Sequence, residues 1–206
     1  MLTPANLPQH ADELAHRDPV IARVLAQYGY PPLWAREAGF PALVHIILEQ
    51  QVSLASAQAA FDKLKAGLNG QITPALFLQL TDDTLRQMGF SRQKTNYCRG
   101  LAQALDSGQL DLEQLADLPD EAVATHLQQL KGVGQWTSDI YLTMCLLRPD
   151  VLPKGDIALL EAFRVLYGYP ARPDHDTFVT ATEHWRPFRS VGIRFLWHFY
   201  LSVRKK

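Results

Sequence analysis

The sequence predicts an all-α fold, and two observations carry this prediction. Apolar residues recur at helical spacing in one segment after another, and Leu43, Ile46 and Ile47 mark the first such helix, over residues 40–51. No alternating run of β-branched residues, the pattern of a half-buried strand, is present. A chain of 206 residues can bury a core as one domain or as two lobes that share one. We expect a single domain over residues 1–206.

Capping residues set the limits of the next helices. Ser53 is a suitable N-cap for a helix over residues 54–68, whose alanine-rich face predicts close contact with a neighbouring helix. Thr73-Pro74 combines a capping residue with proline at the first helical position, where its missing N–H costs nothing. Two more helices follow in this half, one that Thr81 opens and Gly89 closes, and one over residues 92–105 behind the cap Ser91.

The second half of the chain continues the helical pattern. Asp120 and Glu121 stand where acidic residues favour the start of a helix, and that helix is expected to end near Leu130. A glycine hairpin follows, within a motif over residues 120–148. The next helix is predicted to reach Arg148 along an apolar stripe of Trp136, Ile140, Met144 and Leu147. Three last helices are expected over residues 155–167, 174–185 and 187–203.

Composition limits the classes of function. With 47% apolar and 20% charged residues, the chain is typical of a globular domain, and no apolar stretch of about 18 residues predicts a membrane span or a secretion signal. The formal net charge of −1 argues mildly against nucleic-acid binding. Basic residues nevertheless gather in three places, which permits a local basic patch: residues 91–99, 186–194 and 204–206. Only two cysteines are present, which excludes a four-cysteine metal site and suits a reducing compartment.

The most informative feature is the segment Leu130–Asp139, followed further on by Asp156 in the sequence Pro153-Lys154-Gly155-Asp156. Backbone N–H groups at a glycine hairpin that leads into a helix form a site for an anion, such as a DNA phosphate. Asp156 adds a carboxylate on a loop beyond that helix. A phosphate site combined with a carboxylate suggests chemistry on nucleic acid. The alternatives are a simple turn between two helices for the hairpin and a helix N-cap for Asp156.

Five motifs in this order resemble the helix–hairpin–helix DNA glycosylases, and among them the alkylation-repair branch, 3-methyladenine DNA glycosylase II. The resemblance covers roughly residues 40–200. It rests on Ile47–Ser53, Gly89-Phe90-Ser91 with Lys94, the hairpin, Asp156, and Trp185–Ser190 followed by Trp197. It implies two helical lobes with the active-site cleft between them, the second lobe formed by the N-terminal 40 or so residues and the C-terminal helices.

The resemblance implies a role for each residue of the active site. Asp156 matches the catalytic aspartate, which stabilises positive charge on the sugar or activates water, and the sequence leaves these two roles open. Trp136 stands where the branches that also nick DNA carry a lysine, so no β-lyase activity is expected. Trp136 and Trp197 match aromatic residues of the base pocket, although both also suit the protein core. An aromatic face attracts a cationic alkylated base by about 0.5–2 kcal/mol.

One catalytic carboxylate is sufficient if the leaving base is already cationic, as an alkylated purine is. The nearest candidates for a second acid, Glu49 and Glu183, are expected to be solvated or to cap helices. Asp174-His175-Asp176 superficially resembles a metal cluster, but its place at a helix start favours capping.

The resemblance also implies a DNA-binding surface. Gln51 matches the residue that fills the gap left by the flipped nucleotide, with a plain polar residue at a helix end as the alternative. The amides of Gly132 and Gly134 would hold the strand. Contacts to phosphates are expected from Lys94, Arg186 and Arg189, with plain surface charges as the alternative, which is also expected for Arg92 and Arg194. The main-chain carbonyls of Lys131 and Val133 are implied to hold a monovalent cation, Na⁺ or K⁺. No other cofactor is expected.

The expected function is that of a monofunctional DNA glycosylase that excises alkylated purines of the 3-methyladenine and 7-methylguanine types. Its partner would be damaged double-stranded DNA. The protein is expected to be a monomer that does not bind a membrane. It would be found in the cytoplasm of a bacterium or in the nucleus of a eukaryote. Two alternatives remain open: a glycosylase for oxidised or deaminated bases, and a non-catalytic helix–hairpin–helix DNA-binding protein.

Overall fold

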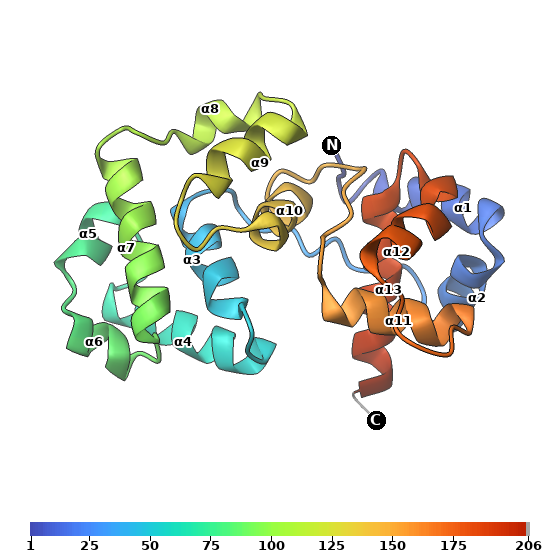
Figure 1. The fold of residues 1–206 in the computed structure, drawn as a ribbon, viewed down its shortest axis with the longest axis horizontal. Helices are drawn as coiled ribbons and strands as arrows, with labels where there is room; N and C mark the ends of the chain where they lie inside the picture. The colour runs from blue at the N-terminus through green and yellow to red at the C-terminus, as the bar shows by residue number, and fades with distance from the viewer. Residues whose placement is uncertain (205–206) are drawn as a thin grey trace. The chain divides into compact units, whose positions relative to one another are not determined.

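The computed structural model describes residues 1–204, and every regular element within them is a helix (Figure 1). The end of the basic tail, residues 205 and 206, lies outside the described residues. The chain forms two compact units. The central unit is Arg36–Cys145, and the terminal unit joins Met1–Ala35 to the segment from Leu146 onward. No helix among the described residues has both the length and the apolar character needed to cross a membrane.

The central unit contains eight of the helices in Figure 1. They are α3 (Phe40–Glu49), α4 (Leu54–Gly67), α5 (Pro74–Gln79), α6 (Asp82–Gln87), α7 (Arg92–Asp106), α8 (Leu112–Ala116), α9 (Asp120–Gln128) and α10 (Gln135–Met144). The predicted caps are confirmed, because the side chains of Ser53, Thr73, Thr81 and Ser91 each accept a hydrogen bond from the backbone N–H three residues on. The short helix α8 was not predicted.

The core of the central unit forms around α3, most of whose residues are buried because the helix packs against α4, α7 and α10. Phe77 lies in an aromatic cluster with Phe40 and Phe90, at ring-centroid distances of 5.6 and 5.9 Å. The predicted contact of the alanine-rich α4 with a neighbouring helix is confirmed, because α4 packs against α3 and its Ala57 and Ala60 are buried.

The terminal unit consists of α1 (Leu7–Arg17), α2 (Pro19–Tyr28), α11 (Ile157–Tyr167), α12 (His175–Ala181), the 3₁₀ helix η1 (Glu183–Trp185) and α13 (Arg189–Arg204). Helix α13 is its centre, because it packs against α1, α2, α11 and η1. No helix was predicted before Phe40. Helix α1 was missed because its buried stripe is only Leu7, Ala11 and Leu14 in an otherwise polar segment.

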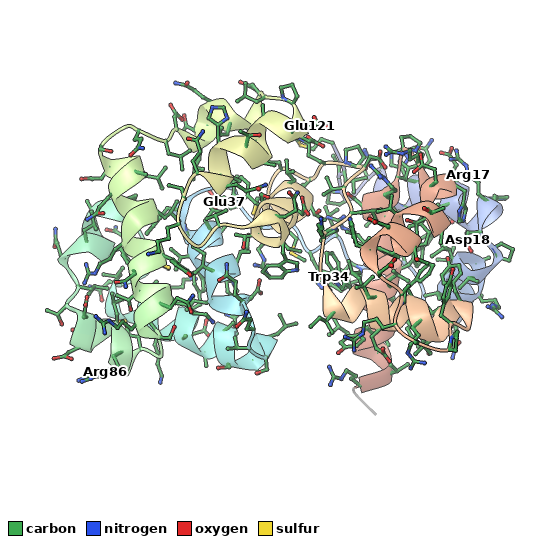
Figure 2. All side chains as sticks on the ribbon, viewed as in Figure 1. Arg17, Asp18, Trp34, Glu37, Arg86 and Glu121 are labelled. Carbon is green, nitrogen blue, oxygen red and sulfur yellow. The ribbon has the colours of Figure 1, made fainter. Side chains whose placement is uncertain are left out.

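Asp18 joins three elements of the terminal unit from the turn between α1 and α2 (Figure 2). Its Oδ1 accepts hydrogen bonds from the backbone N–H groups of Val20 and Ile21 and so caps α2. Its Oδ2 accepts hydrogen bonds from Tyr167, at the end of α11, and from His184 and Trp185 of η1. Asp18 is only 2% exposed, so these bonds replace the water that a carboxylate normally binds.

Three sequence-based expectations differ from the structure. Helix α10 ends at Met144, short of Arg148, because the chain turns through a left-handed residue at Leu147, with φ of 52°. The segment 174–185 is split into α12 and η1. Arg194, expected as a surface charge, is completely buried: its guanidinium donates to the carbonyls of Leu33 and Ser190, and burial lowers its pKa to about 10.

Candidate active site

Asp156 is the N-cap of α11, and its Oδ1 accepts a hydrogen bond of 2.9 Å from the backbone N–H of Leu159. The carboxylate is largely buried, with 8% of the residue exposed. The next residue, Ile157, is 62% exposed, so the start of α11 reaches the surface of the unit beside the carboxylate. A carboxylate has two oxygens with about four acceptor positions, so the capping role and a chemical role are compatible.

The loop that leads to Asp156 is fastened to the start of α13. Asp150 accepts hydrogen bonds from the guanidinium groups of Arg186 and Arg189. Ser190 donates its N–H to the carbonyl of Pro149 over 2.9 Å, and its Oγ accepts the N–H of Val151 over 2.9 Å. The guanidinium of Arg186 therefore faces Asp150 and Glu183, although the sequence suggested a phosphate contact for it.

Trp197, the second expected aromatic residue of the base pocket, lies on α13 in the same unit as Asp156. Only 8% of it is exposed, and its ring meets Trp34 edge to face at 6.3 Å between centroids. Trp34 itself occupies a left-handed turn, with φ of 49°, in the segment after α2 (Figure 2). Trp34 was not predicted as a site residue, although the face of an aromatic ring attracts a cationic base.

The glycine hairpin between α9 and α10 has a backbone that other side chains hold in place. Gly132 has φ of 93°, and the ring of Tyr97 fills the space where a Cβ would stand, 2.1 Å from the nearest ring atom. Gln50 donates from its Nε2 to the carbonyl of Gly132 and to Oγ1 of Thr137, both over 2.9 Å. Gly134 is the N-cap of α10, and no atom lies within 4 Å of its missing Cβ. Its backbone is therefore open to an approaching group.

An open cleft of about 490 Å³ lies beside the hairpin within the central unit. Six residues that the sequence analysis proposed for DNA or cation binding line it: Gln51, Lys94, Lys131, Gly132, Val133 and Gly134. Four further lining residues are amides or an aromatic, namely Gln50, Gln93, Tyr97 and Gln128. The structure thus brings the expected DNA-binding residues of this unit to one polar surface.

Two cleft residues have distinctive surroundings. Gln51 is exposed directly after α3 in a left-handed conformation, with φ of 57°, which turns the chain sharply at this point. Lys94 donates from its Nζ to the carbonyl of Leu48 over 2.6 Å and so satisfies the end of α3. Burial lowers the pKa of Lys94 from its ordinary value. Trp136 is half-buried in the first turn of α10, in the same unit.

The other acidic candidates have structural partners. Glu49 forms a two-point ion pair with Arg36, with N–O distances of 2.6 and 2.9 Å. Its expected solvated or capping role was therefore wrong. Asp174 caps α12 through the N–H of Thr177, as predicted. Among residues 1–204, no group of three or more His, Cys, Asp or Glu side chains could hold a metal ion.

Two cysteines are present in the structure as buried thiols, Cys98 and Cys145. Burial raises the pKa of both, that of Cys145 to about 12, so neither is an activated nucleophile.

Sequence reasoning missed Asp150 and Tyr97. Asp150 stands in an irregular segment and finds its partners far along the chain, so no local pattern marks it. The signal for Tyr97 was equally weak, because an aromatic residue in α7 suits the core as well as a hairpin contact.

Comparison with known proteins agrees with this geometry. Residues 44–187 match the HhH-GPD superfamily of base excision DNA repair proteins. The chain is 30% identical over 158 residues to DNA-3-methyladenine glycosylase 1 of Schizosaccharomyces pombe, covering 75% of this chain and 69% of that protein. It is 25% identical over 202 residues to DNA-3-methyladenine glycosylase of Bacillus subtilis, covering 90% of this chain and 65% of that protein. The chain therefore spans about two thirds of the length of these curated relatives.

Similarity to a solved structure extends over nearly the whole chain. The structure of 3-methyladenine DNA glycosylase from Schizosaccharomyces pombe in complex with abasic DNA superposes with a TM-score of 0.86 at 28% identity. The superposition covers 92% of this chain and 95% of that one. The predicted all-α helix–hairpin–helix glycosylase fold is confirmed. The chain belongs to the HhH-GPD superfamily of base excision DNA repair proteins.

Proposed function

We propose that the protein is a monofunctional DNA glycosylase that excises alkylated purines, of the 3-methyladenine and 7-methylguanine types, in base excision repair. The observation that carries this proposal is the position of Asp156. Its carboxylate is largely buried and is fixed in place as the N-cap of α11. The relatives support the substrate class, because two of them are named as DNA-3-methyladenine glycosylases. The substrate is damaged double-stranded DNA.

Asp156 acts on the sugar. Cleavage of an N-glycosidic bond builds positive charge on the sugar, and a fixed carboxylate stabilises that charge more than mobile water does. The same carboxylate is placed to orient or deprotonate the attacking water. An alkylated purine leaves as a neutral base because it is already cationic, so no second acid has to deliver a proton. The pairing of Glu49 with Arg36 is consistent with a single catalytic carboxylate.

Hydrolysis without strand cleavage follows from Trp136. A lyase needs an amine that forms a Schiff base with the sugar, and an indole cannot do so. We therefore expect an intact abasic site as the product. Trp136 and Trp197 are proposed to contact the flipped base, whose positive charge an aromatic face attracts by about 0.5–2 kcal/mol.

The cleft of the central unit is proposed to bind the DNA strand. Exposed backbone N–H groups at the start of α10 suit a phosphate, and Gly134 leaves that approach open. Gln51 is proposed to enter the gap that the flipped nucleotide leaves, because it is exposed on a sharp turn. The protein would act as a monomer, in the cytoplasm of a bacterium or the nucleus of a eukaryote.

The hairpin carbonyls of Lys131 and Val133 fit a monovalent cation. Among residues 1–204, no hydrogen bond is made to either oxygen, whereas the carbonyl of Gly132 between them is bound by Gln50. Oxygen atoms of this kind are the ligands that such hard cations prefer. A bound cation would supply positive charge beside a DNA phosphate. No redox or nucleotide cofactor is required for the proposed reaction.

The test measures base release from methylated duplex DNA by wild-type protein and by Asp156→Asn. Asparagine remains a good N-cap, so the fold should persist while release falls by at least about 10²-fold. Asp174→Asn is the matched control, since it makes the same change at another helix cap. Equal release by wild type and Asp156→Asn would remove Asp156 from the mechanism.

The same assay separates the alternatives. A panel of duplexes with single alkylated, oxidised or deaminated bases identifies the lesion class, and borohydride trapping reveals any lyase step. Binding of DNA without release from any lesion would favour the non-catalytic DNA-binding protein.

A further inference from the structure

The loop before Asp156 is bound to the first turn of α13 by contacts that we call the loop anchor, between Pro149–Val151 and Arg189–Ser190. Ser190 is completely buried. Its backbone N–H donates to the carbonyl of Pro149, and its Oγ accepts the N–H of Val151, both over 2.9 Å. The main chain on each side of Asp150 is therefore fixed to α13.

The side chain of Asp150 completes the loop anchor. Arg189 donates from Nε to Oδ1 over 2.7 Å and from Nη2 to Oδ2 over 3.0 Å. The same Nη2 also donates to the main-chain carbonyl of Asp150 over 2.9 Å. The side chains of Arg189 and Asp150 are only 13% and 22% exposed. A two-point guanidinium–carboxylate pair of this kind fixes the orientation of both groups.

Asp156 lies between two segments that α13 holds. The loop anchor fixes the segment before it, and α11, which Asp156 caps, packs against α13 after it. The carboxylate of Asp156 therefore depends on α13 from both sides. We propose that Arg189, acting through Asp150, is a positioning residue that sets the place of the Asp156 carboxylate. This inference rests on the proposed function, and it replaces the phosphate contact that the sequence suggested for Arg189.

The two roles of Arg189 have different consequences. A shift of about 1 Å at a reacting group can cost about 10²-fold in rate, even when substrate binding is unchanged. A phosphate contact contributes to affinity, and its loss makes the salt dependence of binding shallower by about 0.9 in logarithmic slope. Lysine can replace arginine as a point charge on a phosphate, but it cannot reproduce the two-point pair with a carboxylate.

The experiment compares Arg189→Lys and Asp150→Asn with wild type. The rate of base release is measured from methylated duplex DNA with enzyme in excess and saturating, so that affinity does not limit it. Affinity for a duplex with an abasic-site analogue is measured at several salt concentrations. We expect both variants to lower the saturated rate by about 10- to 100-fold, with affinity and salt slope unchanged. The control is Arg164→Lys, which alters another arginine–carboxylate pair, with Glu161 on α11.

Two further measurements separate positioning from a general loss of structure. Because Arg189 is proposed to act through Asp156, adding Arg189→Lys to Asp156→Asn should leave the residual rate nearly unchanged, whereas independent damage would multiply the two losses. Amide hydrogen exchange of residues 149–156 should become faster in Arg189→Lys and Asp150→Asn, but not in Arg164→Lys. This second readout does not depend on activity.

Three results would overturn the inference. Weaker DNA binding with a shallower salt slope and a normal saturated rate in Arg189→Lys would show a direct phosphate contact. An unchanged rate and unchanged exchange in both variants would show that the loop anchor does not set the position of Asp156. No base release by wild type, with faster exchange in both variants, would refute the proposed function and leave the loop anchor as structure without a catalytic role.

Discussion

The two units hold their functional residues in different ways. In the terminal unit, three polar side chains are buried and held by hydrogen bonds: Asp156, Asp18 and Arg194. In the central unit, the proposed DNA contacts are exposed side chains such as Gln51 and the main chain at Gly134. A reacting carboxylate needs a fixed orientation, whereas a phosphate needs only correctly shaped backbone N–H groups.

This difference predicts where substitutions act. Changes in the polar network of the terminal unit should cost stability, because they leave buried groups without partners. Substitutions around the glycine hairpin of the central unit should alter the conformation of the hairpin backbone.

Asp18→Ala should have the largest effect on stability. It removes the acceptor for the indole N–H of Trp185, which is completely buried, and for the hydroxyl of Tyr167. We expect the free energy of unfolding to fall by about 3–5 kcal/mol, as when one partner of a buried charged network is removed. Chemical denaturation measures this loss. Asp12→Ala is the control, since it removes one surface hydrogen bond to Tyr30. A loss of similar size in both variants would contradict the special role of Asp18.

Gly132→Ala should distort the hairpin, whereas Gly134→Ala should not. At Gly132, φ is 93° and a Cβ would lie 2.1 Å from Cγ of Tyr97, an atom at the base of the ring that ring rotation cannot move away. We expect a loss of about 2–4 kcal/mol from backbone strain and overpacking. At Gly134, φ is −99° and the space is open, so the loss should be under about 1 kcal/mol. Equal losses in the two variants would refute this account.

Local features of this fold were predictable from the sequence, and long-range ones were not. The caps Ser53 and Ser91 were found because a capping side chain bonds to a backbone N–H three residues away. Asp156 was found as a cap candidate for the same reason, and the hairpin glycines carry their own turn signal. By contrast, Arg194 was placed on the surface, because nothing near it in the sequence reveals that its partner is the carbonyl of Leu33.

The candidate site shows the same limit. The residues around the cleft were named because they stand in compact motifs, such as the run that includes Gln51 and the hairpin. Asp150 was not predicted as a site residue, because its structural role depends on hydrogen bonds from Arg189, which lies 39 residues further along the chain. Charged residues in a sequence do not reveal whether their partner is a phosphate or a distant carboxylate, and only the folded chain decides this.

Gln50→Ala should weaken the hold of the central unit on DNA. Its side chain links the end of α3, directly before Gln51, to the carbonyl of Gly132 and to Thr137. Loss of these two hydrogen bonds should cost about 1–2 kcal/mol of stability, and the looser hairpin should lower affinity for a duplex with an abasic-site analogue. Gln58→Ala, which removes an exposed amide hydrogen bond to Asp62 on α4, outside the cleft, is the control. Unchanged affinity in Gln50→Ala would show that DNA binding by the hairpin does not depend on the hydrogen bonds of Gln50.

Acid should weaken the protein in two pH ranges, one set by a carboxylate and one by histidines, and this effect should be the smallest. Burial alone raises the pKa of Asp18, but hydrogen bonds from Trp185, Tyr167 and His184 outweigh it and hold the pKa below 3.8. A carboxyl whose pKa is depressed in the folded state stabilises the protein at neutral pH. That contribution is lost only as the pH falls below 3.8 towards the folded-state pKa.

His45 in the central unit acts at higher pH. Burial lowers its pKa below 6.5, against the opposing charge of Glu49. As the pH falls, His45 is therefore protonated in the unfolded chain before it is protonated in the folded protein. The free energy of unfolding should decline from about pH 6.5 down to the folded-state pKa of His45. Chemical denaturation at a series of pH values should show this slope, and His45→Gln should reduce it. His175→Gln provides the comparison, because burial also lowers the pKa of that histidine in the terminal unit. A slope that neither variant changes would show that neither half-buried histidine causes the acid sensitivity.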